Sequence, residues 1–188
     1  MTTAPSRAEA WQLLTEHTES ENLRKHALAV EAAMRACAIR KGADPDAWAI
    51  AGLLHDFDYE KHPAPEEHPA FGVSLLRQRG YPEEIIQAIL AHAPHTGVPR
   101  VSEMDKTLFA VDELCGFLIA CALVQPGRRL AEVRLASVRK KLRDKAFARG
   151  VHRDHILQGA SELGAELDEH ITFVLEALVK VAPVLGLA

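Results

Sequence analysis

The chain has 188 residues, of which 48% are hydrophobic and 26% are charged, and its formal net charge is −4. This composition is typical of a globular domain and excludes a disordered, collagen-like or low-complexity chain. The mild negative charge gives no case for nucleic-acid binding. The longest apolar stretch, around 117–124, is too short to span a bilayer, and the N-terminus lacks a basic-then-apolar leader pattern. We therefore expect a cytoplasmic protein that is not bound to a membrane.

Start and stop signals predict helices along almost the whole chain. Ser6-Arg7-Ala8-Glu9 is a capping box that opens the first helix. A second capping box spans Ser102 to Asp105, and Asp44-Pro45 places an N-cap before a proline at the first helical position. The expected helices run over about 6–17, 20–42, 44–56, 70–80, 81–92, 102–124, 137–149, 152–163 and 167–181. No segment alternates with period 2, so we predict one all-α domain of roughly eight or nine helices.

The cysteine and histidine residues limit the kinds of disulfide and metal site that the chain could form. The three cysteines, Cys37, Cys115 and Cys121, form no CxxC pair, so we expect buried free thiols and not a disulfide framework or a thiolate zinc site. The chain has ten histidines but only two tryptophans and two tyrosines. Because histidine is the commonest metal ligand and a frequent acid–base group, the positions of the histidines are informative.

Four positions combine imidazoles with carboxylates: His26, the adjacent pair His55-Asp56, and Asp112. Asp112 stands in the apolar run 108–114, where a carboxylate is costly to bury unless it is paired or binds a metal. A single histidine on an apolar helix is more often a satisfied core residue, so the inference depends on the set of four. Two imidazoles and two carboxylates suit a borderline or hard divalent cation, with positions left for water and substrate.

The order of these residues resembles the HD-domain phosphohydrolases, whose pattern is a histidine, then a His-Asp pair, then a distant aspartate, each on a different helix. The contexts Leu-Leu-His-Asp at 53–56 and Ala-Val-Asp-Glu at 110–113 are also typical of that family. The resemblance covers about 23–118. It implies that His26, His55, Asp56 and Asp112 bind a divalent transition metal (Mn, Fe, Co, Ni or Zn).

The same resemblance implies a domain organisation. The whole chain, 1–188, would form a single HD-type domain. Its metal-site core would lie at about 23–118, followed by a basic helical extension at about 128–181.

A second metal is the next implication of the resemblance. Members of the superfamily with two metals use additional histidines near the positions of His68 and His92, with Asp56 bridging the two metals. Many of them carry two adjacent histidines where this chain has His92 followed by Ala93. His95 would then replace the missing histidine or contact a phosphate group of the substrate. The alternative is that His92 and His95 are polar residues at the mouth of a pocket.

The loop after the His-Asp pair should border the metal. Lys61 is a candidate catalytic residue that would hold a phosphate oxygen, and Asp58 or Glu60 would handle a proton. An ordinary solvated loop is the alternative interpretation. Glu113 would support a ligand histidine or be an exposed helix residue.

The segment 128–153 is strongly basic, with ten lysines and arginines against Glu132 and Asp144. Within it, Lys141, Lys145 and Arg149 would share one helix face at i, i+4 spacing, and Lys141 and Lys145 are the candidate substrate-binding residues. This face would attract an anionic substrate, or it would be a solvated face that balances the acidic remainder of the chain. Phe147 is the only aromatic residue of the segment, which argues against nucleic-acid binding.

Taken together, the residues and the resemblance predict a metal-dependent phosphohydrolase acting through a metal-activated water. The expected substrate is a nucleotide or a small phosphorylated metabolite, and a homodimer is the expected oligomeric state. Two alternatives remain at this point. One is a diiron oxygenase of the same superfamily, and the other is a non-catalytic module that senses a nucleotide.

Overall fold

The computed structural model describes residues 5–188, and over that range it contains helices, turns and loops without a strand. The prediction of an all-α fold is therefore confirmed. The α-helices are α1 (Arg7–His17), α2 (Glu21–Lys41), α3 (Pro45–Leu54), α4 (Ala70–Gln78), α5 (Glu83–His92), α6 (Glu103–Leu123), α7 (Leu135–Arg143), α8 (Arg153–Glu162), α9 (Leu167–Lys180) and α10 (Ala182–Leu185). Two short 3₁₀ turns, η1 (Pro94–Thr96) and η2 (Leu130–Glu132), complete the set.

The predicted helix starts form as their sequences dictate. The Ser6 and Ser102 side chains each accept a hydrogen bond from the backbone amide of the third helical residue. The carboxylate of that residue accepts one from the backbone amide of the cap, so both capping boxes are present. Asp44 accepts hydrogen bonds from the amides of Asp46 and Ala47 ahead of α3. These caps fix where α1, α3 and α6 begin.

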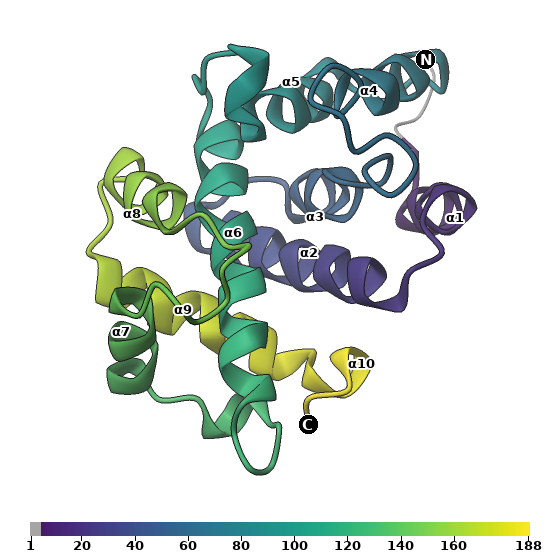
Figure 1. Cartoon of the computed structure of the whole chain (residues 1–188). Helices are drawn as coiled ribbons and strands as arrows, with labels where there is room; N and C mark the ends of the chain where they lie inside the picture. Colours follow the sequence, from purple (N-terminus) through teal and green to yellow (C-terminus); the bar gives the residue numbers. More distant parts are fainter. Residues whose placement is uncertain (1–4) are drawn as a thin grey trace.

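Helix α6 organises the molecule (Figure 1). It crosses the pair formed by α2 and α3, and it also packs against α5, α8 and α9. Leu108, Val111, Phe117 and Leu118 are among its fully buried residues. The three cysteines are buried and unpaired, as expected. A polar side chain in the middle of α6 therefore lies between the first helices of the chain and the last ones.

The C-terminal region departs from the prediction. Helix α7 ends at Arg143 and not at Arg149, because the Arg153 guanidinium donates hydrogen bonds to backbone carbonyl oxygens of the following segment, including those of Asp144 (2.9 Å) and Val151 (3.3 Å). Ala148 adopts a φ of 43°, which a helix does not allow. The expected helix face shared by Lys141, Lys145 and Arg149 consequently does not form.

Two further observations concern the helices as a set. The four-residue helix α10 was not predicted, and it turns the end of the chain back toward α2. Within residues 5–188, no helix is both long and apolar enough to cross a membrane.

Candidate metal centre

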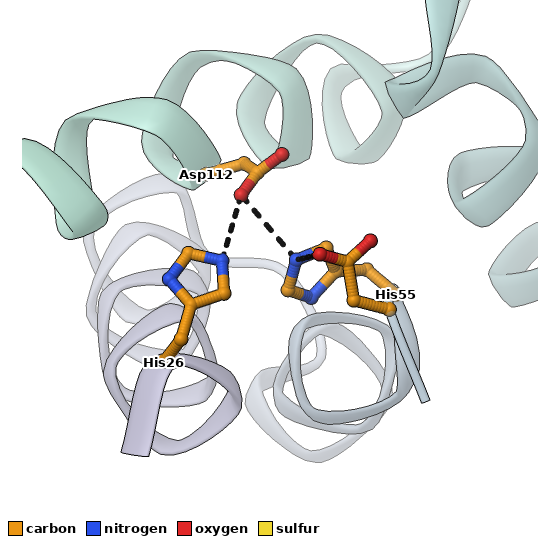
Figure 2. Close-up of side chains that lie close together, drawn as sticks. His26, His55 and Asp112 are labelled. Atoms are coloured by element: carbon orange, nitrogen blue, oxygen red, sulfur yellow. Dashed lines mark hydrogen bonds and ion pairs between the residues drawn. The ribbon is translucent and has the colours of Figure 1, made fainter. Parts of the chain in front are cut away.

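The four predicted ligands meet where α6 crosses α2 and α3. His26 lies on α2, His55 and Asp56 follow directly after α3, and Asp112 lies halfway along α6. His26 Nε2 is 2.9 Å from Asp112 Oδ1, and His55 Nε2 is 3.3 Å from the same oxygen. In Figure 2 both imidazoles point toward the Asp112 carboxylate from the opposite side. One ligand atom from each of the four residues lies within 4.8 Å of every other, so the group could hold a metal ion.

A second group adjoins the first and shares Asp56 with it. His68 Nε2 and His92 Nε2 each lie 3.3 Å from Asp56 Oδ1, whereas His55 Nε2 lies 3.3 Å from Asp56 Oδ2. The two oxygens of one carboxylate therefore face different sets of histidines. These three residues form a second group that could hold a metal ion.

The other ring nitrogen of three histidines is held by the protein. His55 Nδ1 donates to the carbonyl oxygen of Gly52 at 2.8 Å, and His92 Nδ1 donates to that of Ile89. His68 Nδ1 is 2.8 Å from Asp58 Oδ1. Because these acceptors require a proton on Nδ1, Nε2 of each ring can carry the lone pair that a metal ligand needs.

The environment of His55 tests whether a cation fits. Its Nε2 atom is buried and has no hydrogen-bond partner in the part of the chain that the structure describes, although two carboxylate oxygens lie 3.3 Å away. A buried polar atom without a partner is uncommon in proteins. A neutral imidazole lone pair facing two anionic oxygens would be unfavourable without a positive charge among them. The donor set of nitrogen and carboxylate oxygen atoms therefore fits a divalent transition metal.

The charges in this centre shift the pKa values of its residues in the metal-free protein. Burial alone would lower the pKa of His55, but the charges of Asp56 and Asp112 outweigh burial and raise it well above 6.5. Burial also lowers the pKa of His68, yet its hydrogen bonds to Asp56 and Asp58 raise it to about 9. Burial raises the pKa of Asp56 and Asp112, but the neighbouring histidines lower it well below the usual range. The metal-free centre thus holds ionised Asp56 and Asp112 beside protonated His55 and His68.

The remaining predicted site residues lie outside the two groups. Lys61 Nζ donates to the carbonyl oxygen of Glu16 at 3.0 Å, at the end of α1. Lys141 Nζ donates to Ser137 Oγ within α7, and Lys145 lies exposed beyond that helix. His95 Nε2 donates to the backbone carbonyl of His68 at 2.7 Å, so it adjoins the second group without facing Asp56. The roles predicted for these four residues remain predictions.

The carboxylates near the His-Asp pair have structural contacts. Glu60 accepts hydrogen bonds from the backbone amides of Glu19 and Ser20, ahead of α2. Glu113 accepts one from the backbone amide of His152, ahead of α8.

The contact of Asp58 with His68 is not predicted by the sequence. Asp58 is buried, and its second oxygen accepts a hydrogen bond from the Gly72 amide at 2.7 Å. The two residues are ten positions apart across a loop, so no helical or strand spacing signals the pair. Asp58 instead stood out only by its proximity to the His-Asp pair.

Comparisons with known proteins agree with this geometry. The family model described as HD domain matches residues 23–115, a range that holds all six residues of the two groups. Ribonuclease Y of Desulfotalea psychrophila is 32% identical over 148 residues, which are 76% of this chain and 26% of that protein. Ribonuclease Y of Oleidesulfovibrio alaskensis is 29% identical over 166 residues, which are 83% of this chain and 30% of that protein. The chain therefore spans less than a third of the length of these relatives. No solved structure matches the chain.

Proposed function

Because residues 23–115 carry an HD domain and the chain belongs to the HD-domain superfamily, we propose that it is a phosphohydrolase that cleaves a phosphate ester at a centre of two divalent cations. Two cations are supported by the positions of the two Asp56 carboxylate oxygens. Oδ2 lies near His55, whereas Oδ1 lies near His68 and His92. A carboxylate in this position suits a bridging ligand. His26 and Asp112 complete the first site.

Two divalent cations at this centre would promote hydrolysis of a phosphate ester in two ways. Divalent cations at these positions would lower the pKa of a bound water and neutralise charge on the phosphoryl oxygens. The chain's part is to hold the four imidazole and carboxylate groups of the first site where α6 crosses α2 and α3, and to restrict access to them. His55, His68 and His92 have side chains less than 10% exposed, whereas those of His26, Asp56 and Asp112 are 20–24% exposed. Water and substrate would therefore enter on the side of His26, Asp56 and Asp112.

The substrate class has two candidates. A nucleotide or small phosphorylated metabolite is the candidate that the resemblance to the HD-domain phosphohydrolases implies. RNA is the second candidate, because the two curated relatives are both named ribonuclease Y. Both candidates contain the same reacting group, a phosphate ester.

An assay of phosphate-ester hydrolysis tests the proposal. Protein purified without chelator is reconstituted with manganese, iron, cobalt, nickel or zinc and offered mononucleotides, sugar phosphates and a short RNA. We expect metal-dependent hydrolysis that falls at least ~100-fold in His92→Ala, since a ligand of the centre is removed. His62→Ala is the matched control, because His62 stacks on Phe71 outside both groups and should keep full activity.

Other outcomes would replace the proposal. Two bound irons with oxygen consumption and no hydrolysis would indicate the oxygenase. Nucleotide binding without turnover under every metal would indicate the sensing module.

A further inference from the structure

A cavity of about 350 Å³ opens beside His26, between α2, α6 and the last residues of the chain. Its size lies within the ~300–1,000 Å³ range of small-molecule sites. His26 forms one wall, and the same ring faces Asp112 through Nε2 at 2.9 Å. The cavity and the first metal group therefore share a side chain.

Helix geometry gives the separation between the cavity and the metal ligands. Gly116 lines the cavity and follows Asp112 by four residues on α6, and Asn22 lines it and precedes His26 by four residues on α2. Four residues are about one helical turn, or ~6 Å. A phosphate held at the metal group would thus place its organic substituent, one sugar ring away, in the cavity.

The chemistry of the walls indicates which substituent fits. Five of the lining side chains are aliphatic, and they belong to Ile119, Ala120, Leu123, Leu185 and Leu187. The polar groups are the Asn22 amide and the Lys25 ammonium, which lies 3.8 Å from Glu21. An acyl chain would leave the amide unused, and a bare sugar phosphate would leave the aliphatic walls without a partner. A nucleobase has apolar faces and a hydrogen-bonding edge, which match both features.

We propose that this cavity binds the nucleoside part of the substrate, which would therefore be a nucleoside phosphate. The proposal rests on the phosphohydrolase function proposed above. It assigns Asn22 to the edge of the base and Lys25 to a further negative charge on the substrate. Gly116 provides the space that the nucleoside occupies.

The last residues of the chain line this cavity but lie outside the region that matches the family model. The cavity is therefore not formed by that region alone. Leu185 and Leu187 lie beyond residues 23–115. Gly186 between them has a φ of 73°, and the Leu187 carbonyl oxygen accepts a hydrogen bond from the Leu130 amide at 2.9 Å. The tail is thereby held against η2 while its side chains close the cavity.

Gly116 offers a matched pair of variants. A Cβ atom added there would meet only the His26 ring, at 3.9 Å, which is an ordinary contact. Gly116→Ala should therefore fold like the wild type, and it serves as the folding control for the larger substitution. Gly116→Leu extends three further carbon atoms into the cavity without altering a metal ligand.

The experiment is calorimetric titration of the metal-loaded protein with nucleoside monophosphates, ribose 5-phosphate and inorganic phosphate. We expect the wild type to bind one nucleoside monophosphate at least ~10-fold more tightly than ribose 5-phosphate. Gly116→Leu should lose that preference while its metal content and its affinity for inorganic phosphate stay unchanged. Asn22→Leu, on the exposed first turn of α2, should weaken nucleotide binding about 5-fold without affecting folding.

Several results would overturn the inference. One is equal affinity of the wild type for ribose 5-phosphate and for nucleotides. Another is nucleotide binding to Gly116→Leu that equals that of the wild type, or, should Gly116→Leu fail to fold, unchanged binding to Asn22→Leu. Nucleotide binding that depends on Gly116 but is accompanied by no hydrolysis of any ester would contradict only the proposed function. Hydrolysis of esters without a nucleoside preference would contradict only the inference.

Discussion

Asp58 is buried between His68 and the start of α4, where its two oxygens have different partners. One accepts a hydrogen bond from His68 Nδ1 and the other from the Gly72 amide. The carboxylate therefore keeps the proton of His68 on Nδ1 and leaves Nε2 directed at Asp56. Groups that orient a ligand histidine in this way commonly change metal affinity when they are replaced.

We predict that Asp58→Asn weakens the second cation site. An asparagine cannot accept hydrogen bonds on both sides, so either the Gly72 amide loses its acceptor or the amide NH₂ faces His68 Nδ1 and shifts the ring proton to Nε2. Affinity at the second site should fall ~10–100-fold, with the first site unchanged, as measured by metal titration. Glu60→Gln in the same loop is the control. Equal losses at both sites would contradict the positioning role.

A second prediction at this scale concerns protons. Because the pKa of His68 is about 9 in the metal-free protein, a cation must displace a proton from it at neutral pH. Metal affinity should therefore increase as the pH rises toward about 9 and weaken as the pH falls. Calorimetry in buffers of different ionisation enthalpy should detect proton release that is smaller in His68→Ala. Identical heats in all buffers would show that no proton is displaced.

The individual residues show how much of the site can be predicted from the sequence alone. The six residues of the two groups are the ones predicted as ligands, because their order along the chain resembles a known pattern. Lys61 and Asp58 were both assigned chemistry from their closeness to the His-Asp pair. The structure directs Lys61 to the end of α1 and Asp58 to His68. The positions of these two side chains depend on the path of a loop. A loop sequence has no periodicity from which that path could be predicted.

The contact between α2 and α3 determines the position of His55. Gly52 lies in this contact, and a Cβ atom added there would be 2.9 Å from the Val30 carbonyl oxygen and 3.0 Å from the Met34 side chain. The Gly52 carbonyl also accepts the hydrogen bond from His55 Nδ1. The small residue therefore serves both the packing of two helices and the orientation of a ligand.

We predict that Gly52→Ala lowers the free energy of unfolding by ~1–3 kcal/mol, because the backbone of α2 cannot move aside freely. Gly116→Ala is the matched control, since its added methyl group has ordinary space. That variant should be unchanged or more stable by ~0.5–1 kcal/mol, as alanine favours a helix over glycine. Denaturant unfolding measures both, and equal stability of the two variants would contradict the close contact.

Helix α7 shows why some elements are not predictable from local signals. The sequence 137–149 has helical spacing and lacks an internal glycine or proline. The helix nevertheless ends at Arg143, where carbonyl groups of the next segment bind the Arg153 guanidinium. The competing interaction comes from a residue on the following helix. By contrast, α1, α3 and α6 begin at local caps, and their starts were predicted correctly.

At the scale of the whole molecule, the two metal groups connect elements that are distant in sequence. Their residues come from α2, the end of α3, the loop before α4, the end of α5 and the middle of α6. In the metal-free state this convergence places the Asp56 and Asp112 carboxylates close to protonated His55 and His68. Cations that bind the folded chain and not the unfolded one would stabilise this arrangement.

The central claim is a centre for two cations that share Asp56, and metal content per chain tests it most directly. Elemental analysis would compare the wild type, His92→Ala and Asp56→Ala after reconstitution and removal of loosely bound metal. The wild type should retain two equivalents, one for each group of ligands. His92→Ala should retain one equivalent, and Asp56→Ala should lose tight binding at both sites. A wild type that retains no cation, or an Asp56→Ala variant that keeps both, would contradict the shared centre.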